Sequence, residues 1–473
     1  MNMLEGPMLL NILLIALPLA ATSILQMLFN AADVAVVGRF AGSLALAAVG
    51  ANTTNINLFV NFITGIAVGA NVLISSYIGR DEKKEVASAV NSIMSLALVS
   101  GIFMIGIGFL AARPLLLLTS CPENVFDQAL LYLRLYMFGM PFIILFNFGS
   151  AILRSIGDTR RPLMALVFSG IFNVILNIIL VVVCHMDVAG VAIATVVSNI
   201  ISAGIVVGIL LQEDSIIRWN ILSPPPYNPS IADEEETASD LADIQAKNVT
   251  TSHKPALSIK PHHLKEILYV GGPSGLQGSL FSISNLVLQT GINSLGASAI
   301  AGSSTALNYE YVTYYIILSF ASTAVTYASQ NHAAGKKDRC RRVYILCVLT
   351  GMLITACFSG IFILNESSLL RLFTTDAAVL AFASIRMHHV VLLEAFTGPF
   401  EISAGTLRGI GKSISPSVVS ILGACVFRIF WMQTVFRTYH TFATIMNVYI
   451  VSWLLMGSIL VTESIYLLWI KKN

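Results

Sequence analysis

Long apolar runs, each able to cross a lipid bilayer as a helix, recur along the whole chain. A span needs about 20 apolar residues, and two sets of such runs flank a polar break. The first set is 7–37, 44–78, 87–111, 126–153, 162–184 and 188–211, and the second is 263–293, 299–330, 342–364, 378–407, 414–436 and 441–470. This pattern predicts an all-α integral membrane protein of about twelve transmembrane helices.

The polar break divides the chain into an N-terminal six-helix lobe (1–211), a linker (212–262) and a C-terminal six-helix lobe (263–473). The linker holds three consecutive prolines from Pro224 and an acidic run, Asp233 to Glu236, which favour a flexible segment. Several runs exceed a straight span, so we expect tilt or kinks at Pro18, Pro141, Pro273 and Pro399.

The two lobes carry the same motifs at nearly one offset, which indicates an internal repeat. The sharpest match is Leu153-Arg-x-Ile-Gly-x4-Pro162, which recurs as Leu407-Arg-x-Ile-Gly-x4-Pro416. Because each unit has six spans, the copies enter the membrane in the same direction and form a parallel repeat. We therefore expect a transporter of two lobes about a central cleft.

Basic residues predict the orientation of the chain in the membrane. Most of its 27 Lys and Arg residues fall in the loops of one side, whereas the opposite loops hold only Arg39, Arg113, Arg371 and Arg437. We expect both termini and the acidic linker to be cytoplasmic, and the protein to lie in the plasma or inner membrane. The glycosylation-type triplet at Asn248 would then be a chance match.

Composition excludes several classes of function. Hydrophobic residues make up 56% of the chain and charged residues 11%, and the net charge of +2 gives no reason to expect nucleic acid as a partner. The six cysteines lack the spacing of a disulfide framework or zinc site. No nucleotide-binding loop or hydrolase motif is present. We expect neither enzyme activity nor a cofactor nor direct use of ATP, and we expect a monomer driven by an ion gradient.

The first lobe contains one acidic residue within a span, which is costly in a membrane and calls for an explanation. Asp33 shares a helical face with Gln26 and Asn30. Further polar groups come from the fifth and sixth spans: Asn173, Asn177 and Thr195. The cluster could be a packing network, or it could bind an ion. Asp33, Asn173 and Asn177 would offer oxygen ligands to Na⁺, whereas desolvation of Asp33 would favour a proton.

The second lobe has a different set of buried ionisable groups. Glu394 and Glu401 are seven residues apart, on one face of a regular helix. One interpretation is that a glutamate pairs with Arg428, since a buried charge needs a partner. The other is that these residues form an anionic, aromatic-lined wall for an amphiphilic cation. Its candidate substrate-binding residues are Glu310, Glu394, Glu401 and Tyr314.

The motifs of the first half resemble those of the multidrug and toxic compound extrusion (MATE) family. The resemblance rests on Leu17-Pro18, Asp33-Val-Ala-Val-Val-Gly-Arg39, Leu44-Ala-Leu-Ala-Ala-Val-Gly50, Gly65-x3-Gly69-Ala-Asn71 and Leu153-Arg-Ser-Ile-Gly-Asp-Thr159. It covers the chain apart from the linker and is less specific in the second half. It implies a V-shaped, two-lobed antiporter that exports organic, often cationic compounds in exchange for Na⁺ or H⁺.

The resemblance also implies a role for Asp33, because family members with an acid fifteen residues after the proline of the first helix use it for ion coupling. This chain has Pro18 and Asp33 at that spacing. The family pattern on the fifth helix is Asn-x3-Asp, and here Asn177 replaces the acid, while Thr195 is kept. Loss of one carboxylate should weaken cation binding or shift the protein towards proton coupling. A second-lobe acid of another branch is replaced by Phe281.

We therefore expect a secondary active exporter in which Asp33 couples an ion or proton to cargo movement. Two alternatives remain open from the sequence. A lipid-linked glycan flippase shares the two-lobed fold but should need basic groups in its cleft, and Arg134, Arg386 and Arg428 are the intramembrane arginines. A non-transporting receptor or scaffold would instead use the linker for docking.

Overall fold

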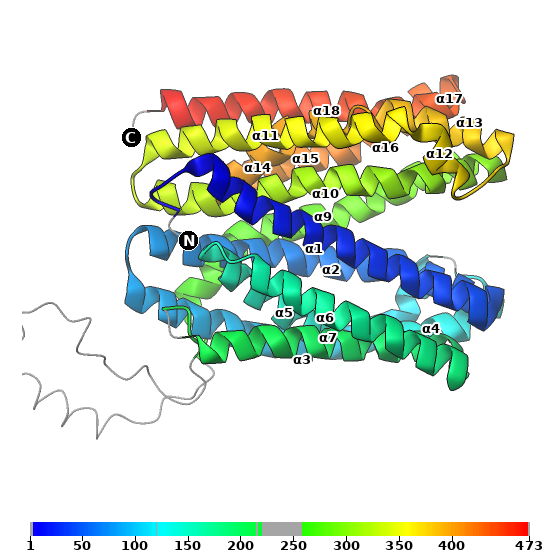
Figure 1. Cartoon of the computed structure of the whole chain (residues 1–473), viewed down its shortest axis with the longest axis horizontal. Helices are drawn as coiled ribbons and strands as arrows, with labels where there is room; N and C mark the ends of the chain where they lie inside the picture. The colour runs from blue at the N-terminus through cyan, green and yellow to red at the C-terminus, as the bar shows by residue number, and fades with distance from the viewer. Residues whose placement is uncertain (1–2, 120, 214–215, 220–257, 472–473) are drawn as a thin grey trace, which may run out of the picture.

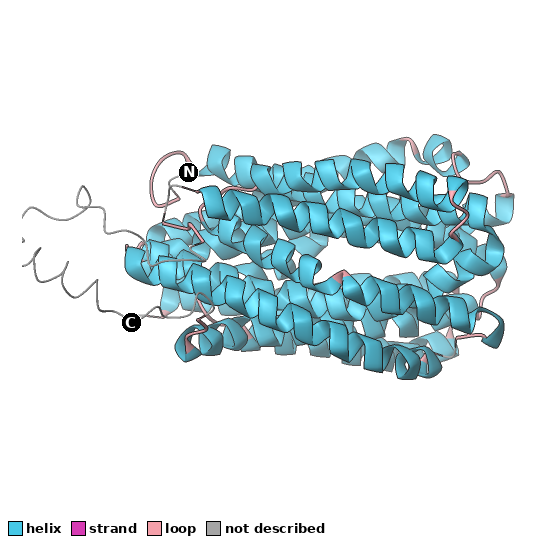
Figure 2. Ribbon diagram, turned by 90° about the horizontal axis from the view of Figure 1, so that it is seen from below, coloured by secondary structure: helices cyan, strands magenta, loops and turns pink. Residues whose placement is uncertain are grey.

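The computed structural model describes residues 3–119, 121–213, 216–219 and 258–471. These residues form helices and connecting turns, with no strand among them. A helix satisfies every backbone hydrogen bond within itself, which is the requirement a bilayer imposes on an apolar segment. The helices run roughly parallel along the long axis of the molecule, and both termini lie at one end, which we call the terminal end (Figures 1 and 2).

The first lobe contains six crossings, two of which include a turn of π-helix. In chain order they are α1 (Met8–Val36) with the π-helical turn Val37–Ala41, α2 (Gly42–Gly79), α3 (Lys83–Leu118), the pair α4 (Glu123–Phe138) and α5 (Met140–Ser155), α6 (Arg160–Asn177) with the π-helical turn Ile178–Val183, and α7 (Asp187–Gln212). Each agrees with an apolar run predicted from the sequence. The predicted linker begins where α7 ends.

The second lobe repeats this plan with more breaks in its helices. Its crossings are α9 (Pro261–Asn293), α10 (Ala297–Ala333), α11 (Lys337–Leu364), then α13 (Ala377–Arg386) with α14 (Gly398–Gly409), α15 (Ile414–Ile421) with α16 (Phe427–Gln433) and α17 (Val435–Thr438), and α18 (Phe442–Ile465), and the short α12 (Glu366–Arg371) precedes α13. The all-α fold with twelve crossings in two lobes is thus confirmed. Within the linker, residues 220–257 lie outside the described residues, and so does the triplet at Asn248.

The repeat is visible in the turns between helices. Positive φ angles recur at residues separated by 254 positions: Gly42 and Gly296, Asp81 and Gly335, Gly157 and Gly411. Side chains are strained in this left-handed conformation, which glycine adopts freely. The same turn geometry therefore joins equivalent helices in both lobes.

Two of the four prolines predicted to kink a helix follow a bend between two helical segments. Helices α4 and α5 meet at 44°, two residues before Pro141, and the α13 and α14 segments meet at 40°, a few residues before Pro399. Proline lacks the amide hydrogen that would continue the preceding helix. In contrast, Pro18 and Pro273 lie inside α1 and α9 without ending either helix.

The lobes meet most closely where α2 crosses α9. A Cβ added to Gly65 would lie 2.3 Å from backbone atoms of Gly275, so glycine is required at this approach. Other contacts between the lobes are hydrogen bonds near the terminal end. Ser329 Oγ donates to the Val72 carbonyl at 2.9 Å, and the Gln330 amide donates to the Ser155 carbonyl. The lobes are therefore joined from the middle of α2 to the terminal end.

Helix α1 belongs to both lobes. Its first half packs on the second lobe, with Ile12 and Ile15 in one buried cluster with Phe320 of α10. Its second half continues beside α6 of the first lobe, so that α1 runs diagonally across the molecule (Figure 1). This course places Asp33, near the end of α1, inside the first lobe.

Candidate functional site

Asp33 is the centre of a hydrogen-bond network built by three helices of the first lobe. Its side chain is buried, with 8% exposure. The Asn177 amide of α6 donates to Asp33 Oδ1, and the Thr195 hydroxyl of α7 lies 3.4 Å from Oδ2. The same Asn177 amide donates to Asn173 Oδ1 at 3.2 Å, one turn earlier on α6. The structure thus brings together four of the five residues predicted for ion coupling.

The fifth predicted residue, Gln26, is not part of this network. Its side chain is exposed, as is that of Asn30, whereas Asp33 is buried. The helical spacing placed the three residues on one stripe, but the buried face of α1 changes along its length because the helix leaves one lobe for the other. Asp33 therefore reaches α6 and α7 without its polar neighbours on α1.

The position of Asp33 depends on a close approach between α1 and α6. A Cβ added to Gly170 would lie 1.9 Å from the ring of Phe29, one turn before Asp33. One turn after Asp33 and directly after Asn177, the helices change to π-helical turns, Val37–Ala41 and Ile178–Val183. Such turns are frequent at functional sites, where they alter the direction of the side chains that follow.

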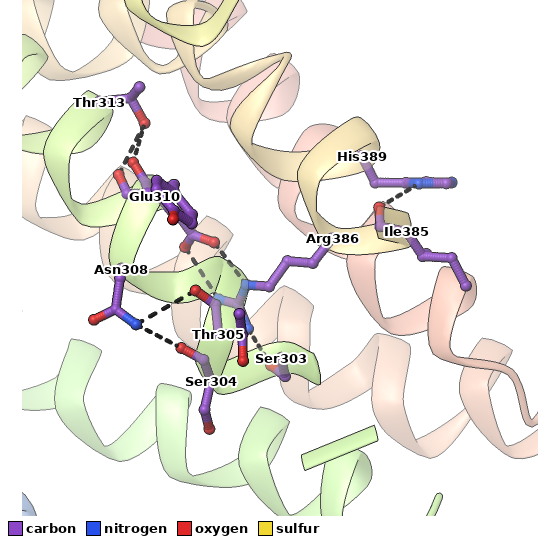
Figure 3. A network of polar contacts seen from close by, with 10 residues as sticks. Ser303, Ser304, Thr305, Asn308, Glu310, Thr313, Ile385, Arg386 and His389 are labelled. Atoms are coloured by element: carbon purple, nitrogen blue, oxygen red, sulfur yellow. Dashed lines mark hydrogen bonds and ion pairs between the residues drawn. The ribbon is translucent and has the colours of Figure 1, made fainter. Parts of the chain in front are cut away.

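Glu310 of the second lobe is held by a buried arginine. Arg386 Nε donates to Glu310 Oε2 at 2.7 Å and Nη2 donates to Oε1 at 3.1 Å, while Nη1 donates to Ser303 (Figure 3). Arg386 is 3% exposed. A bidentate pair of this kind neutralises the carboxylate and fixes its orientation. Glu310 is thus less available to a cationic cargo than the sequence suggested.

Arg428 does not pair with a glutamate, contrary to one interpretation of the sequence. It is 1% exposed, its Nε lies 3.3 Å from Ser452 Oγ, and its guanidinium stands 4.6 Å from the ring centre of Tyr449 and 5.2 Å from that of Phe281. Within the described ranges it forms no ion pair, and its Nη1 has no hydrogen-bond partner. Aromatic faces supply part of its stabilisation.

The two remaining glutamates occupy different environments. Tyr314 donates to Glu401 Oε1 at 3.1 Å, whereas Glu394 Oε2 is buried without a hydrogen-bond partner. Glu394 lies in a short 3₁₀ segment before α14, so the regular seven-residue spacing to Glu401 is broken. Arg386 and Arg428 act on the charge of Glu394, so the interior of the second lobe contains buried charges of both signs. The anionic, aromatic-lined wall remains a prediction.

A comparison with known protein families decides the identity of the fold. The MatE family model matches residues 18–179 and again 273–434, so that one model describes both lobes. This chain belongs to the MatE family. The matched segments begin at Pro18 and Pro273, which confirms the repeat.

Curated relatives of this MatE chain are named as multidrug resistance proteins or as a transporter. It is 23% identical to the probable multidrug resistance protein NorM of Thermotoga maritima, over 88% of this chain and 83% of the relative. It is 24% identical to the probable multidrug resistance protein YpnP of Bacillus subtilis, over 90% of this chain and 87% of the relative. A third relative, 22% identical over 83% of this chain and 80% of its own length, is the FAD transporter of Shewanella oneidensis.

Solved structures confirm the MatE fold. The chain superposes with a TM-score of 0.82 on the outward-facing conformation of a multidrug resistance MATE family transporter, at 19% identity and with 98% of this chain and 96% of that chain covered. A MOP superfamily transporter from Pyrococcus furiosus gives a TM-score of 0.84, at 19% identity and with 98% and 97% covered. The protein is a membrane transporter of this family and not an enzyme.

Two features of the MatE site were not predicted from the sequence. The salt bridge between Arg386 and Glu310 joins α13 to α10, and its only sequence signal was the presence of both charges within spans. Gly170 gave no signal at all, because its importance depends on Phe29 of another helix.

Proposed function

We propose that this protein is a secondary active antiporter that exports organic compounds in exchange for an ion bound at Asp33. The observation that carries the proposal is the burial of Asp33 between the Asn177 amide of α6 and the Thr195 hydroxyl of α7. A carboxylate in such a place can gain and lose a cation with a change in the hydrogen bonds of three helices. That is the property needed to couple an ion gradient to movement of the lobes.

The hydrogen bonds favour a proton as the coupling ion. Asn177 turns its amide nitrogen towards Asp33, whereas the Thr195 hydroxyl lies 2.9 Å from the Val191 carbonyl, to which it donates, and 3.4 Å from Asp33 Oδ2. A Na⁺ ion at Asp33, Asn173 and Asn177 would require oxygen atoms to face the ion instead. Protonation of Asp33 needs no such rearrangement, and it would weaken the bond from Asn177.

The course of α1 supports a route from Asp33 to the lobe interface. A change in the hydrogen bonds of Asp33 alters how the second half of α1 packs on α6. The first half of the same helix is fixed to the second lobe through Ile12, Ile15 and the Met3 carbonyl, which accepts from Asn331. Movement of one half relative to the other would therefore change the contact between the lobes.

For the cargo, we propose an amphiphilic organic cation that contacts Glu401, Glu394 and Tyr314. Glu394 carries a buried oxygen without a partner, and such a group is stabilised by a cation that brings hydrogen-bond donors. The alternative is an anionic cargo, such as the lipid-linked glycan of a flippase. The unpaired guanidinium of Arg428 is the observation that favours it.

The test is transport by purified protein in liposomes under imposed gradients. Asp33→Asn should abolish uptake of a fluorescent cation driven by a pH gradient, while Asp187→Asn, at an exposed position in the same lobe, should behave as wild type. If Asp33→Asn transported the dye at the wild-type rate, Asp33 would have no coupling role. If a Na⁺ gradient drove uptake at equal pH on both sides, the coupling ion would be Na⁺ and not the proton.

A further inference from the structure

A cluster of two histidines and a glutamate connects the lobes at the terminal end, far along the chain from Asp33. Glu85 lies in the first turn of α3, and His262 and His263 lie in the first turn of α9. Three potential ligand atoms, one from each residue, all lie within 4.8 Å of one another. The first lobe thus contributes the carboxylate and the second lobe both imidazoles.

His263 is the buried member of this cluster. Its side chain is completely buried, with 0% exposure. Its Nε2 lies 3.3 Å from Glu85 Oε2, close enough to pair with the carboxylate when this nitrogen carries a proton. A metal ion between the two atoms would take the place of that proton.

One of the distances within the cluster has the value expected of a zinc site. Ligand atoms bound tetrahedrally at about 2.0–2.1 Å, as in zinc sites, are separated from each other by about 3.3–3.4 Å. The His263 Nε2 to Glu85 Oε2 distance is 3.3 Å, and His262 Nε2 lies 3.8 Å from the same oxygen. The other ring nitrogen of His263, Nδ1, is 2.9 Å from Ser92 Oγ on α3. Such a second contact orients the ring of a metal-binding histidine.

We propose that Glu85, His262 and His263 bind a divalent transition-metal ion, with zinc as the best fit and water as the fourth ligand. Two imidazoles and one carboxylate form a ligand set that zinc accepts, whereas Mg²⁺ and Ca²⁺ prefer oxygen ligands. Lys260 is the competing cation, because its Nζ lies 3.5 Å from Glu85 Oε2. The metal replaces this ammonium group at the carboxylate.

A metal ion at this place has a conformational consequence, which rests on the proposed function. The ion links α3 of the first lobe to α9 of the second at the end where the lobes already touch. It therefore stabilises the arrangement in which the terminal end is closed, and it slows transport, which requires that end to open.

The test is zinc binding by full-length protein in detergent, measured by calorimetry with a purification tag that contains no histidine. Wild type should bind one zinc ion per chain. Loss of second-shell partners alone weakens metal sites by about 10–100-fold, so His262→Gln and Glu85→Gln should each weaken binding at least tenfold. Both residues are partly exposed, so these variants should fold even if His263→Gln does not. Lys260→Met should strengthen binding.

A matched control comes from His388, whose Nδ1 lies 3.6 Å from Glu366 without a third ligand in the part of the chain described. His388→Gln should bind zinc as wild type does. Absence of saturable binding, or equal loss in His388→Gln and His262→Gln, would overturn the site. Co²⁺ should give the absorption of a tetrahedral complex in wild type and not in Glu85→Gln.

Transport in liposomes separates the site from its effect. Micromolar zinc should slow dye transport by wild type and leave His262→Gln unaffected. Binding without inhibition would remove the regulatory role and keep the site. Lack of transport in the absence of zinc would contradict the proposed function alone, because the binding measurement does not depend on it.

Discussion

Replacement of Arg386 by glutamine tests whether the buried pair with Glu310 is a structural unit. The substitution removes the hydrogen bonds at 2.7 and 3.1 Å and leaves a carboxylate that is 9% exposed without its counter-charge. Breaking a buried pair by removing one partner costs about 3–5 kcal/mol, mostly because the remaining charge is uncompensated. We expect Arg386→Gln to lower the thermal unfolding midpoint of the detergent-solubilised protein by several degrees.

The double variant Arg386→Gln with Glu310→Gln distinguishes the charge effect from a loss of packing. Two amides of similar volume can hydrogen-bond to each other, so most of the loss should be recovered. A replacement of both members of a buried ion pair by neutral residues is often close to neutral in stability. If the double variant were as unstable as Arg386→Gln, the carboxylate would not be the source of the cost. Equal stability of Arg386→Gln and wild type would refute the reasoning as a whole.

Three further predictions concern the first lobe and the lobe interface. Gly170→Val should reduce pH-driven dye transport at least tenfold, because even a Cβ at this position would lie 1.9 Å from the Phe29 ring. The smaller change Gly170→Ala should be rescued by Phe29→Ala. Asn177→Asp should make transport depend on Na⁺, since a second carboxylate beside Asp33 increases the charge offered to a cation; an unchanged Na⁺ response would contradict it. Gly65→Leu should push α2 away from α9. Cysteines placed at Val72 and Ser329, where the Ser329 hydroxyl donates to the Val72 carbonyl, should then form a disulfide in lower yield. An unchanged yield would show that the crossing tolerates the side chain.

The helices could be predicted from the sequence because the bilayer fixes their length and because the repeat doubles the signal. Even the interrupted crossing from α15 to α17 occupies Ile414–Thr438, close to the expected 414–436. Regular helical spacing also predicted the Asn173 and Asn177 pair, since four residues return to the same face of α6. Local periodicity was sufficient to predict which side chains lie together wherever the helix is regular and the same neighbours pack along its length.

The same periodicity was insufficient where a helix is irregular or its partner is distant. Glu394 follows the π-helical turn Met387–Val391 and begins a 3₁₀ segment, so its direction relative to Glu401 cannot be obtained by counting residues. The partner of Glu310 depends on which helix lies beside α10. No partner for Glu310 was predicted from the sequence, and the packing of α13 against α10 brings Arg386 to it.

The diagonal course of α1 also affects how the protein matures during synthesis. Asn331 donates to the Met3 carbonyl across 328 residues of sequence, and Ile12 and Ile15 are buried by helices made long after them. While the first lobe inserts, the side of α1 that carries Ile12 and Ile15 lacks its partner helices from the second lobe. The nascent protein must therefore keep this surface uncovered in the membrane until α10 emerges, and any premature partner for that surface would compete with correct assembly.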